Sequence, residues 1–167
     1  SSSRVDQFVA NSRFVAERIR RFYGRDAEVV APPVDTDFFH PGADSAPEAA
    51  RPYALVVAAL APYKRVDLAI QACERLGIEL RIVGTGPERA HLERLAQGAT
   101  HFLGWVGAQE LRQLYREARF LVQPGIEDFG IAPVEALACG TPVVAAGAGG
   151  VLDVVDPPRH GLFHRPE

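Results

Sequence analysis

Short apolar runs alternate with amphipathic stretches along most of this 167-residue chain, and that alternation restricts its fold more than any other feature. The apolar runs predict strands at Gln7–Ala10, Ala27–Ala31, Tyr53–Leu60, Glu79–Val83, Thr100–Leu103, Phe120–Gln123 and Pro142–Ala146. The stripes between them predict helices through Val15–Phe22, Val66–Leu76, Leu92–Leu95, Leu111–Ala118 and Ile131–Ala138. Strands that alternate with helices over short loops are typical of βαβ units with right-handed crossovers. We therefore predict an α/β fold with a parallel, doubly wound sheet, and a Pro- and Ala-rich connector over 32–52.

The composition narrows the class of protein. Hydrophobic residues make up 47% and charged residues 23%, as in an ordinary globular protein, and the length predicts a single domain. Eighteen Lys and Arg residues against 21 Asp and Glu give a net charge of −3, which does not favour nucleic-acid binding. No stretch of apolar residues is long enough to predict a membrane span. The two cysteines, Cys73 and Cys139, fit a reducing compartment such as the cytoplasm.

The ends of the chain predict that it is a piece of a longer protein. It contains no Met, begins with Ser1-Ser2-Ser3 and stops at Arg165-Pro166-Glu167 without a closing helix. Removal of an initiator Met is the alternative explanation for the first residues.

Two loops at predicted strand ends carry candidate ligand-binding residues. A doubly wound sheet binds ligands outside the carboxyl ends of its strands, here after Leu60, Val83, Leu103, Gln123 and Ala146. Lys64 and Arg65 follow the first of these strands and precede a helix, which suits a diphosphate. The alternative is two solvated surface cations. Gly84 and Gly86 form half of a G-x-G-x-x-G pattern, which favours a tight strand-to-helix turn over the close approach of a ligand.

Other candidate residues favour structural explanations. Asp35 and Asp37 form a D-x-D pair, but two carboxylates in a connector are too few for an oxygen-ligand metal site. We therefore predict no bound metal. The five histidines show no ligand spacing. Arginines crowd the first helix, where a solvated face is favoured over contact with anionic lipid, at Arg13, Arg18, Arg20 and Arg21.

The most informative segment is 125–144, which carries two glutamates. Glu127 lies in a loop at the end of a predicted strand, and Glu135 lies within the next helix among apolar neighbours. A buried carboxylate needs partners, and its two acceptor oxygens match a vicinal diol. Two such groups around a helix N-terminus could hold the ribose diol and the sugar hydroxyls of a nucleotide sugar, with the diphosphate between them. The alternative is one capping and one salt-bridged glutamate.

The same segment resembles a known family. Glu127 and Glu135, within Glu-Asp-Phe-Gly-Ile and Glu-Ala-Leu-Ala-Cys-Gly-Thr-Pro, resemble the hallmark of the retaining family 4 glycosyltransferases. The segment 62–67 resembles a subgroup rich in bacterial mannosyltransferases of surface-polysaccharide assembly. Further matches, which extend the resemblance over essentially the whole chain, lie at 9–13, 32–35, 83–87 and 102–106.

The resemblance implies a fold and a place in a larger protein. It implies a Rossmann-like domain that is one half of a GT-B glycosyltransferase, namely the C-terminal nucleotide-sugar-binding domain over 1–167. The N-terminal acceptor-binding domain and the final crossover helix are expected to lie outside this chain. That arrangement is in line with the absence of Met and with the abrupt ends.

The resemblance also implies a role for each matching residue. Glu127 is expected to contact hydroxyls of the donor sugar, Glu135 to hold the ribose diol, and Lys64 to neutralise the diphosphate leaving group. Backbone groups are expected to approach the donor at Gly84, Gly86, Phe129, Gly130, Ile131, Trp105 and Val106, the last two beside the base. Many family members have Gly-Arg-Leu where this chain has Ala58-Ala59-Leu60, and Arg65 is expected to replace the missing arginine.

The function implied by the resemblance is retaining transfer of mannose from GDP-mannose, without a metal or another cofactor. A lipid-linked saccharide is the expected acceptor, in polysaccharide or glycolipid synthesis in the cytoplasm or on the inner face of the plasma membrane. The isolated piece is expected to be inactive. The alternatives are a transferase that uses a UDP-sugar and a nucleotide-binding module without transfer activity, which would not need Glu127. A dinucleotide oxidoreductase is disfavoured because no complete G-x-G-x-x-G follows the first strand.

Overall fold

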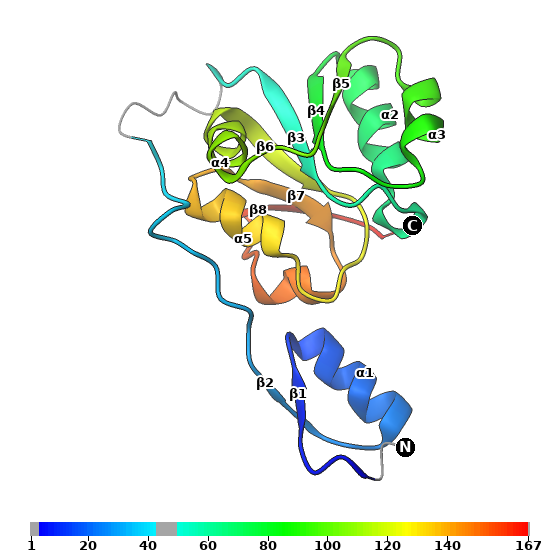
Figure 1. Cartoon of the computed structure of the whole chain (residues 1–167), viewed down its shortest axis with the longest axis vertical. Coiled ribbons are helices and arrows are strands. Elements are labelled where there is room, and N and C mark those ends of the chain that lie inside the picture. Colours follow the sequence, from blue (N-terminus) through cyan, green and yellow to red (C-terminus); the bar gives the residue numbers. More distant parts are fainter. Residues whose placement is uncertain (1–3, 43–49, 167) are drawn as a thin grey trace.

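The computed structural model describes residues 4–42 and 50–166, and within them six strands form one parallel sheet (Figure 1). The strands are β3 (Tyr53–Val57), β4 (Glu79–Val83), β5 (Thr100–Gly104), β6 (Ala118–Gln123), β7 (Val143–Ala146) and β8 (Gly161–His164). Their order across the sheet is β5-β4-β3-β6-β7-β8. The chain order reverses between β3 and β6, and that is where α/β sheets of this kind open a crevice for ligands.

Helices cover both faces of this sheet, as the alternating sequence pattern predicts (Figure 1). They are α2 (Val66–Leu76), α3 (Arg89–Leu95), α4 (Ala108–Glu117) and α5 (Ile131–Ala138). Alternate residues of β3 serve the two faces, because Ala54 and Val56 pack with α2, whereas Tyr53 and Leu55 pack with α4 and α5. The predicted fold class, α/β with a doubly wound, Rossmann-like parallel sheet, is therefore confirmed.

The first two predicted strands do not join this sheet. Within the described chain, β1 (Phe8–Ala10) and β2 (Ala27–Val29) pair only with each other, in parallel, and α1 (Arg13–Tyr23) connects them. No helix follows β2 in residues 30–42, so the chain leaves it as an extended connector rather than as a helical crossover. Residues 8–29 form the N-terminal unit, which Figure 1 shows in blue below the main sheet.

Polar contacts hold the N-terminal unit against the main sheet. Arg13 donates from its backbone N and from Nε to the carboxylate of Asp153, at 2.7 and 2.6 Å. Arg18 Nη1 donates to Asp128 Oδ1 at 2.6 Å, and Ser12 Oγ donates to the Asp128 carbonyl. Ser12 also caps α1, because its side chain accepts a hydrogen bond from the backbone N of Val15. These contacts fix α1 beside the loops that follow β6 and β7, at the carboxyl end of the sheet.

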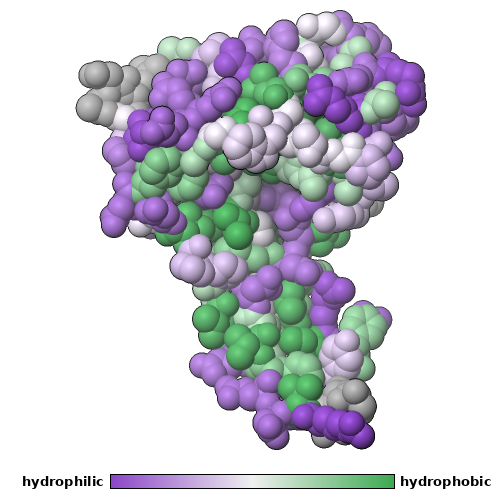
Figure 2. All heavy atoms as spheres, in the orientation of Figure 1, coloured by the Kyte–Doolittle hydropathy of each residue, from purple (hydrophilic) through white to green (hydrophobic). Residues whose placement is uncertain are grey.

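The N-terminal unit exposes much of its apolar surface. Within the described chain, α1 buries none of its residues, and large hydrophobic side chains are exposed at Val9, Phe22, Tyr23 and Val29, and at Val30 directly after the unit. Figure 2 shows hydrophobic residues gathered on this lower part of the molecule. Clustered exposed apolar residues are typical of a surface that contacts another protein.

Several predicted boundaries differ from the structure. Ala118, predicted on a helix stripe, is the first residue of β6 and is fully buried, because α4 ends where the chain turns into the sheet. The long strand predicted over 53–60 ends at Val57, where pairing with β4 stops. The predicted connector at 32–52 lies partly outside the described residues. β8 is absent from the prediction because Gly161 and His164 interrupt its apolar pattern.

Candidate functional site

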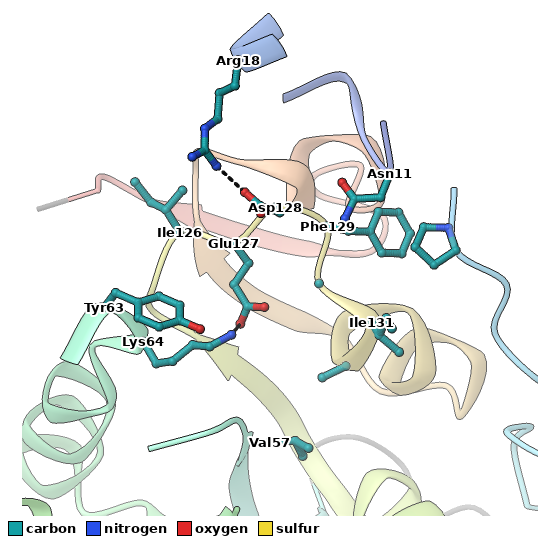
Figure 3. Close-up of a pocket in the computed structure, with 13 residues that line it drawn as sticks. Asn11, Arg18, Val57, Tyr63, Lys64, Ile126, Glu127, Asp128, Phe129 and Ile131 are labelled. Carbon is teal, nitrogen blue, oxygen red and sulfur yellow. Dashed lines mark hydrogen bonds and ion pairs between the residues drawn. The ribbon is translucent and has the colours of Figure 1, made fainter. Parts of the chain in front are cut away.

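A cleft of about 610 Å³ opens at the carboxyl ends of β3 and β6, where the strand order reverses. Figure 3 shows that its side chains come from α1, from the short 3-10 helix η3 (Pro62–Lys64) and from the loop after β6. The lining residues are Asn11, Arg18, Pro32, Val57, Tyr63, Lys64, Ile126, Glu127, Asp128, Phe129, Gly130, Ile131 and Ala132. The cleft is thus the crevice that the fold predicts, with the N-terminal unit as one wall.

Lys64 and Glu127, both predicted as site residues, face each other in this cleft (Figure 3). Lys64 Nζ lies 2.6 Å from Glu127 Oε1, and the two side chains are only 13% and 21% exposed. Lys64 is the only lysine among the 18 basic residues of the chain. The pair is therefore a partly buried ion pair whose charges are far less screened by solvent than surface charges are.

A close approach between two loops brings this pair together. A Cβ atom at Gly125 would lie 2.5 Å from the carbonyl oxygen of Tyr63, so only glycine lets the loop after β6 contact η3 here. The backbone N of Gly150 donates to the Glu127 carbonyl at 2.8 Å and holds that loop from its other side. Both sides of the Glu127 loop are thus fixed by backbone contacts.

The N-terminus of α5 forms the floor beside the ion pair. Gly130, Ile131 and Ala132 line the cleft, and α5 has no side-chain cap at its N-terminus. The backbone N–H groups of a helix's first turn lack intrahelical partners and attract anions. The predicted segment Phe129-Gly130-Ile131 therefore lies where its amides can approach an anion next to Lys64.

Glu135 lies one turn further along α5 and does not line the cleft itself. Its Oε2 accepts a hydrogen bond from Tyr115 Oη at 2.7 Å, so the carboxylate has the partner that its apolar surroundings require. Burial raises the pKa of Glu135, and the Tyr115 hydrogen bond partly offsets that rise. Burial and the neighbouring carboxylate of Glu135 raise the pKa of Tyr115 as well. Glu135 is thus a half-buried acid held rigidly on the helix.

Arg65 points away from Lys64. It pairs with Asp67 at 3.2 Å and lines separate, smaller hollows beside α2, and it is absent from the cleft lining. Its backbone φ of 50° lies in the left-handed region, where the chain passes from η3 into α2. The structure therefore does not bring Arg65 together with Lys64 and Glu127, and its contact with a diphosphate stays a prediction.

Four other predicted positions lie outside the lining of the cleft. Gly84 and Gly86 have a packing role, because a Cβ atom on either would fall within 2.4 Å of a backbone oxygen of the chain after β3. That agrees with the tight turn favoured from the sequence. Trp105 is 82% exposed, whereas Val106 packs against the core beside α4. Ligand contacts at these four positions stay predictions.

Two cleft residues come from the N-terminal unit, and sequence reasoning did not assign them to the site. Arg18 pairs with Asp128 at 2.6 Å, with side chains 51% and 56% exposed. Asn11 borders the same cleft, and its buried Oδ1 has no hydrogen-bond partner among the described residues. The sequence predicts Arg18 on a solvated face among the other arginines of the first helix. The docking of α1 on the main sheet is what brings it to the cleft.

The D-x-D pair has a structural explanation in part. Asp35 Oδ1 accepts a hydrogen bond from the backbone N of Phe38 at 2.9 Å, and Asp35 therefore caps a turn of the connector. Within the described residues, no three side chains of His, Cys, Asp or Glu group together as a metal site would require. The prediction that no metal is needed stays untested.

The arrangement of charges defines what the cleft can bind. A cation, an uncapped helix N-terminus and a carboxylate lie side by side, so one region suits an anion and the next suits hydroxyl groups. Along the chain, Glu127 precedes the α5 N-terminus and Glu135 follows it, but only Glu127 lines the cleft. A ligand with a diphosphate between two diols therefore stays a prediction for this pair. Glu127 is salt-bridged, as the alternative interpretation holds, but Glu135 caps nothing and instead bonds a buried tyrosine.

Comparison with known proteins identifies the family. The chain matches the family described as glycosyl transferases group 1 over residues 43–167, and it belongs to that family. The N-terminal unit precedes the matched region. Within the described residues, no helix combines the length and apolar character needed to cross a membrane.

Curated relatives carry transferase names. The chain is 34% identical to a D-inositol 3-phosphate glycosyltransferase of Mycobacteroides abscessus, over 98% of this chain and 42% of that protein. It is 35% identical to a GDP-mannose-dependent alpha-mannosyltransferase of Corynebacterium glutamicum, over 78% of this chain and 33% of that protein. The chain therefore spans less than half the length of either relative.

Solved structures share the fold. A sucrose-phosphate synthase from Thermosynechococcus elongatus superimposes with a TM-score of 0.82 at 26% identity, covering 98% of this chain and 46% of that one. Anabaena HepE, solved in complex with UDP-glucose, gives a TM-score of 0.84 at 22% identity and covers 97% of this chain and 50% of its own. The second likeness shows a shared fold alone.

Proposed function

We propose that this chain is the donor-binding domain of a retaining family 4 glycosyltransferase that takes mannose from GDP-mannose. The observation that carries the proposal is the Lys64–Glu127 pair beside the uncapped N-terminus of α5, at the point where the strand order reverses. The name of the Corynebacterium glutamicum relative supports GDP-mannose as donor. A UDP-sugar is the second candidate donor, as it is among the alternatives from the sequence.

In this proposal Lys64 contacts the diphosphate and Glu127 contacts the sugar. Lys64 is the less exposed of the two basic side chains in the cleft, and an ammonium there stabilises the charge that develops on the leaving diphosphate. The α5 amides add neutral donors to the same oxygens. Glu127 accepts hydrogen bonds from sugar hydroxyls, since a carboxylate offers two acceptor oxygens.

Glu135 holds the ribose diol in this proposal. We expect it to lie beyond the diphosphate, because it follows the α5 N-terminus by about one turn, and its hydrogen bond with Tyr115 supports one orientation of the carboxylate. The exposed ring of Trp105 and the backbone of Val106, after β5, are the proposed neighbours of the base. The donor would then extend from β5 across α5 to the loop of Glu127.

Binding is proposed to need no metal ion or other cofactor. Lys64 and the α5 amides together supply positive potential to the anion, which is what a divalent cation would otherwise provide. Chelator added during a binding titration should leave the affinity for GDP unchanged. Loss of binding on chelation would place a metal in the site.

The rest of the enzyme is proposed to bind the acceptor. The chain spans under half of its relatives, and the exposed apolar residues of the N-terminal unit are the proposed contact surface for an acceptor-binding domain. That domain would present a lipid-linked saccharide, in polysaccharide or glycolipid synthesis at the inner face of the plasma membrane. Arg65, which pairs with Asp67 here, would reach the diphosphate only after a change of rotamer.

A panel of nucleotide sugars tests the proposal. Calorimetric titration of the chain with GDP-mannose, UDP-glucose and ADP-glucose should show saturable binding of GDP-mannose, with a higher affinity than for the other two. Preference for UDP-glucose would support the second candidate donor. Absence of binding to all three would contradict the proposal.

A further inference from the structure

The carboxylate of Glu127 lies against the Lys64 ammonium, on the side where a phosphate bound to Lys64 would also lie. The two groups lie 2.6 Å apart, and both side chains are largely shielded from water. Lys64 therefore has its charge neutralised within the protein before any ligand arrives. An anion that binds Lys64 must compete with Glu127 or accept it as a close neighbour.

The two nucleotide states of the reaction differ in charge at this point. The terminal phosphate of a nucleoside diphosphate carries about 1.5 to 2 negative charges at pH 7, because its second pKa is about 6. In a sugar nucleotide that phosphate is esterified, so the second ionisation is lost. The attached sugar also offers hydroxyl donors in place of negative charge. Glu127 therefore repels the nucleoside diphosphate more strongly than the sugar nucleotide.

We propose that Glu127 makes this cleft discriminate between the sugar nucleotide and the nucleoside diphosphate left after transfer. With the sugar nucleotide bound, Glu127 exchanges its ion pair with Lys64 for sugar hydroxyls. With the nucleoside diphosphate bound, Glu127 faces a phosphate dianion and has no donor in exchange for Lys64. This inference rests on the proposed function, and it adds a means of favouring substrate over product.

A second ion pair in the same cleft provides a contrast. Arg18 and Asp128 are also 2.6 Å apart, but their side chains are more than half exposed. Solvent screens such a pair, so its carboxylate repels an anion weakly. Asp128→Asn removes the same charge as Glu127→Gln from the adjacent residue and leaves Lys64 paired. It is therefore the matched control.

The experiment compares GDP with GDP-mannose by calorimetric titration of the wild-type chain, Glu127→Gln and Asp128→Asn. Glu127→Gln should bind GDP about tenfold more tightly than wild type, because the amide neither repels the phosphate nor neutralises Lys64. It should gain less for GDP-mannose or lose affinity for it, so the preference for the sugar nucleotide falls. Asp128→Asn should change both affinities by the same small factor.

The outcomes separate a failure of the discrimination by Glu127 from a failure of the proposed donor site. If wild type binds GDP-mannose but Glu127→Gln binds GDP no more tightly than wild type, the discrimination by Glu127 is overturned and the proposed donor site stands. If wild type binds none of the four ligands GDP, GDP-mannose, UDP and UDP-glucose, the proposed function fails and this inference fails with it. A gain of equal size in Asp128→Asn would assign the effect to general charge and overturn the specific role.

A second variant and a second signal guard against a local folding defect. Glu127→Ala should also gain affinity for GDP, although it loses the proposed contacts with the sugar hydroxyls of GDP-mannose. Because Lys64 is the only lysine, protein labelled with ¹⁵N-lysine gives one side-chain ammonium signal. That signal should differ between the unliganded wild-type chain and the unliganded Glu127→Gln variant. It should shift again when GDP binds. A signal unmoved by either change would show that Lys64 takes no part.

Discussion

Lys64 is a single ammonium in a chain that otherwise uses guanidinium groups, and it is far less exposed than Arg18 in the same cleft. An ammonium is a compact charge on a flexible stem, whereas a guanidinium is a planar fork. In the gap beside Glu127 a compact charge can turn from one anion to another with a small movement of its stem. The identity of this residue therefore fits a cation that exchanges partners when a ligand binds.

Glu135→Gln tests the buried acid on α5. Burial raises the pKa of Glu135 above its ordinary value of 4.5, so the folded chain keeps this proton at pH values where the unfolded chain has lost it. The free energy of unfolding therefore falls as pH rises through that window. The variant lacks this titration and should melt at a higher temperature than wild type at pH 7.

Thermal melts at two pH values check this expectation. The advantage of Glu135→Gln should vanish below about pH 4, where both side chains are neutral, because the amide oxygen can still accept from Tyr115. The same variant should bind GDP and GDP-mannose about tenfold more weakly, since a charged acceptor of the ribose diol is lost. Lower stability at pH 7 with unchanged binding would show that Glu135 is only structural.

The sequence predicts part of the site at this scale. Lys64 and Glu127 were predictable because each follows a strand whose carboxyl end faces the crevice. Tyr115 falls within the predicted helix stripe Leu111–Ala118, but nothing in that stripe shows that its hydroxyl reaches Glu135. Arg18 could not be placed either, since its position depends on how the N-terminal unit docks.

At the scale of elements, one close approach between loops places the charged pair. Gly125→Ala would set a Cβ atom 2.5 Å from the Tyr63 carbonyl and force the loop after β6 away from η3. The change should separate Lys64 from Glu127, abolish measurable nucleotide binding and lower the free energy of unfolding by about 1–3 kcal/mol. Urea unfolding and calorimetry on the same preparation measure both effects.

Gly107→Ala is the matched control for this variant. Its added Cβ would meet nothing within 4 Å, and its φ of −71° suits any residue. It should bind as wild type does and lose far less stability than Gly125→Ala, because the only cost is the weaker N-cap that alanine gives α4. Retained binding in Gly125→Ala would show that the approach of the two loops does not build the site.

Element prediction succeeded where the apolar period was continuous. The β3, β4 and β6 strands and the helices that cover them follow from buried runs and apolar stripes. The separate pairing of β1 with β2 did not follow, because period-two alternation is the same whichever sheet a strand joins. Strand partners depend on connections, and the extended connector after β2 is what separates the two sheets.

At the scale of the whole molecule, the chain alone should bind donor but transfer no sugar. In the proposed function the cleft would supply charge stabilisation for a leaving group, whereas transfer also requires an acceptor held at attack distance. Incubation with GDP-mannose and lipid-linked or simple saccharide acceptors should give no glycoside above the level seen without protein. Donor binding by the same preparation is the control, and chain-dependent glycoside formation would contradict the expectation.

In the proposed function the cleft between β3 and β6 is a donor site organised around Lys64. Calorimetric titration of GDP-mannose into wild type, Lys64→Ala and the control Arg75→Ala, an exposed cation on α2, tests it most directly. Lys64→Ala should lose about 1–3 kcal/mol of binding free energy, as expected for a charge-assisted contact, while Arg75→Ala binds as wild type does. Equal affinity in all three proteins would show that Lys64 does not contact the donor.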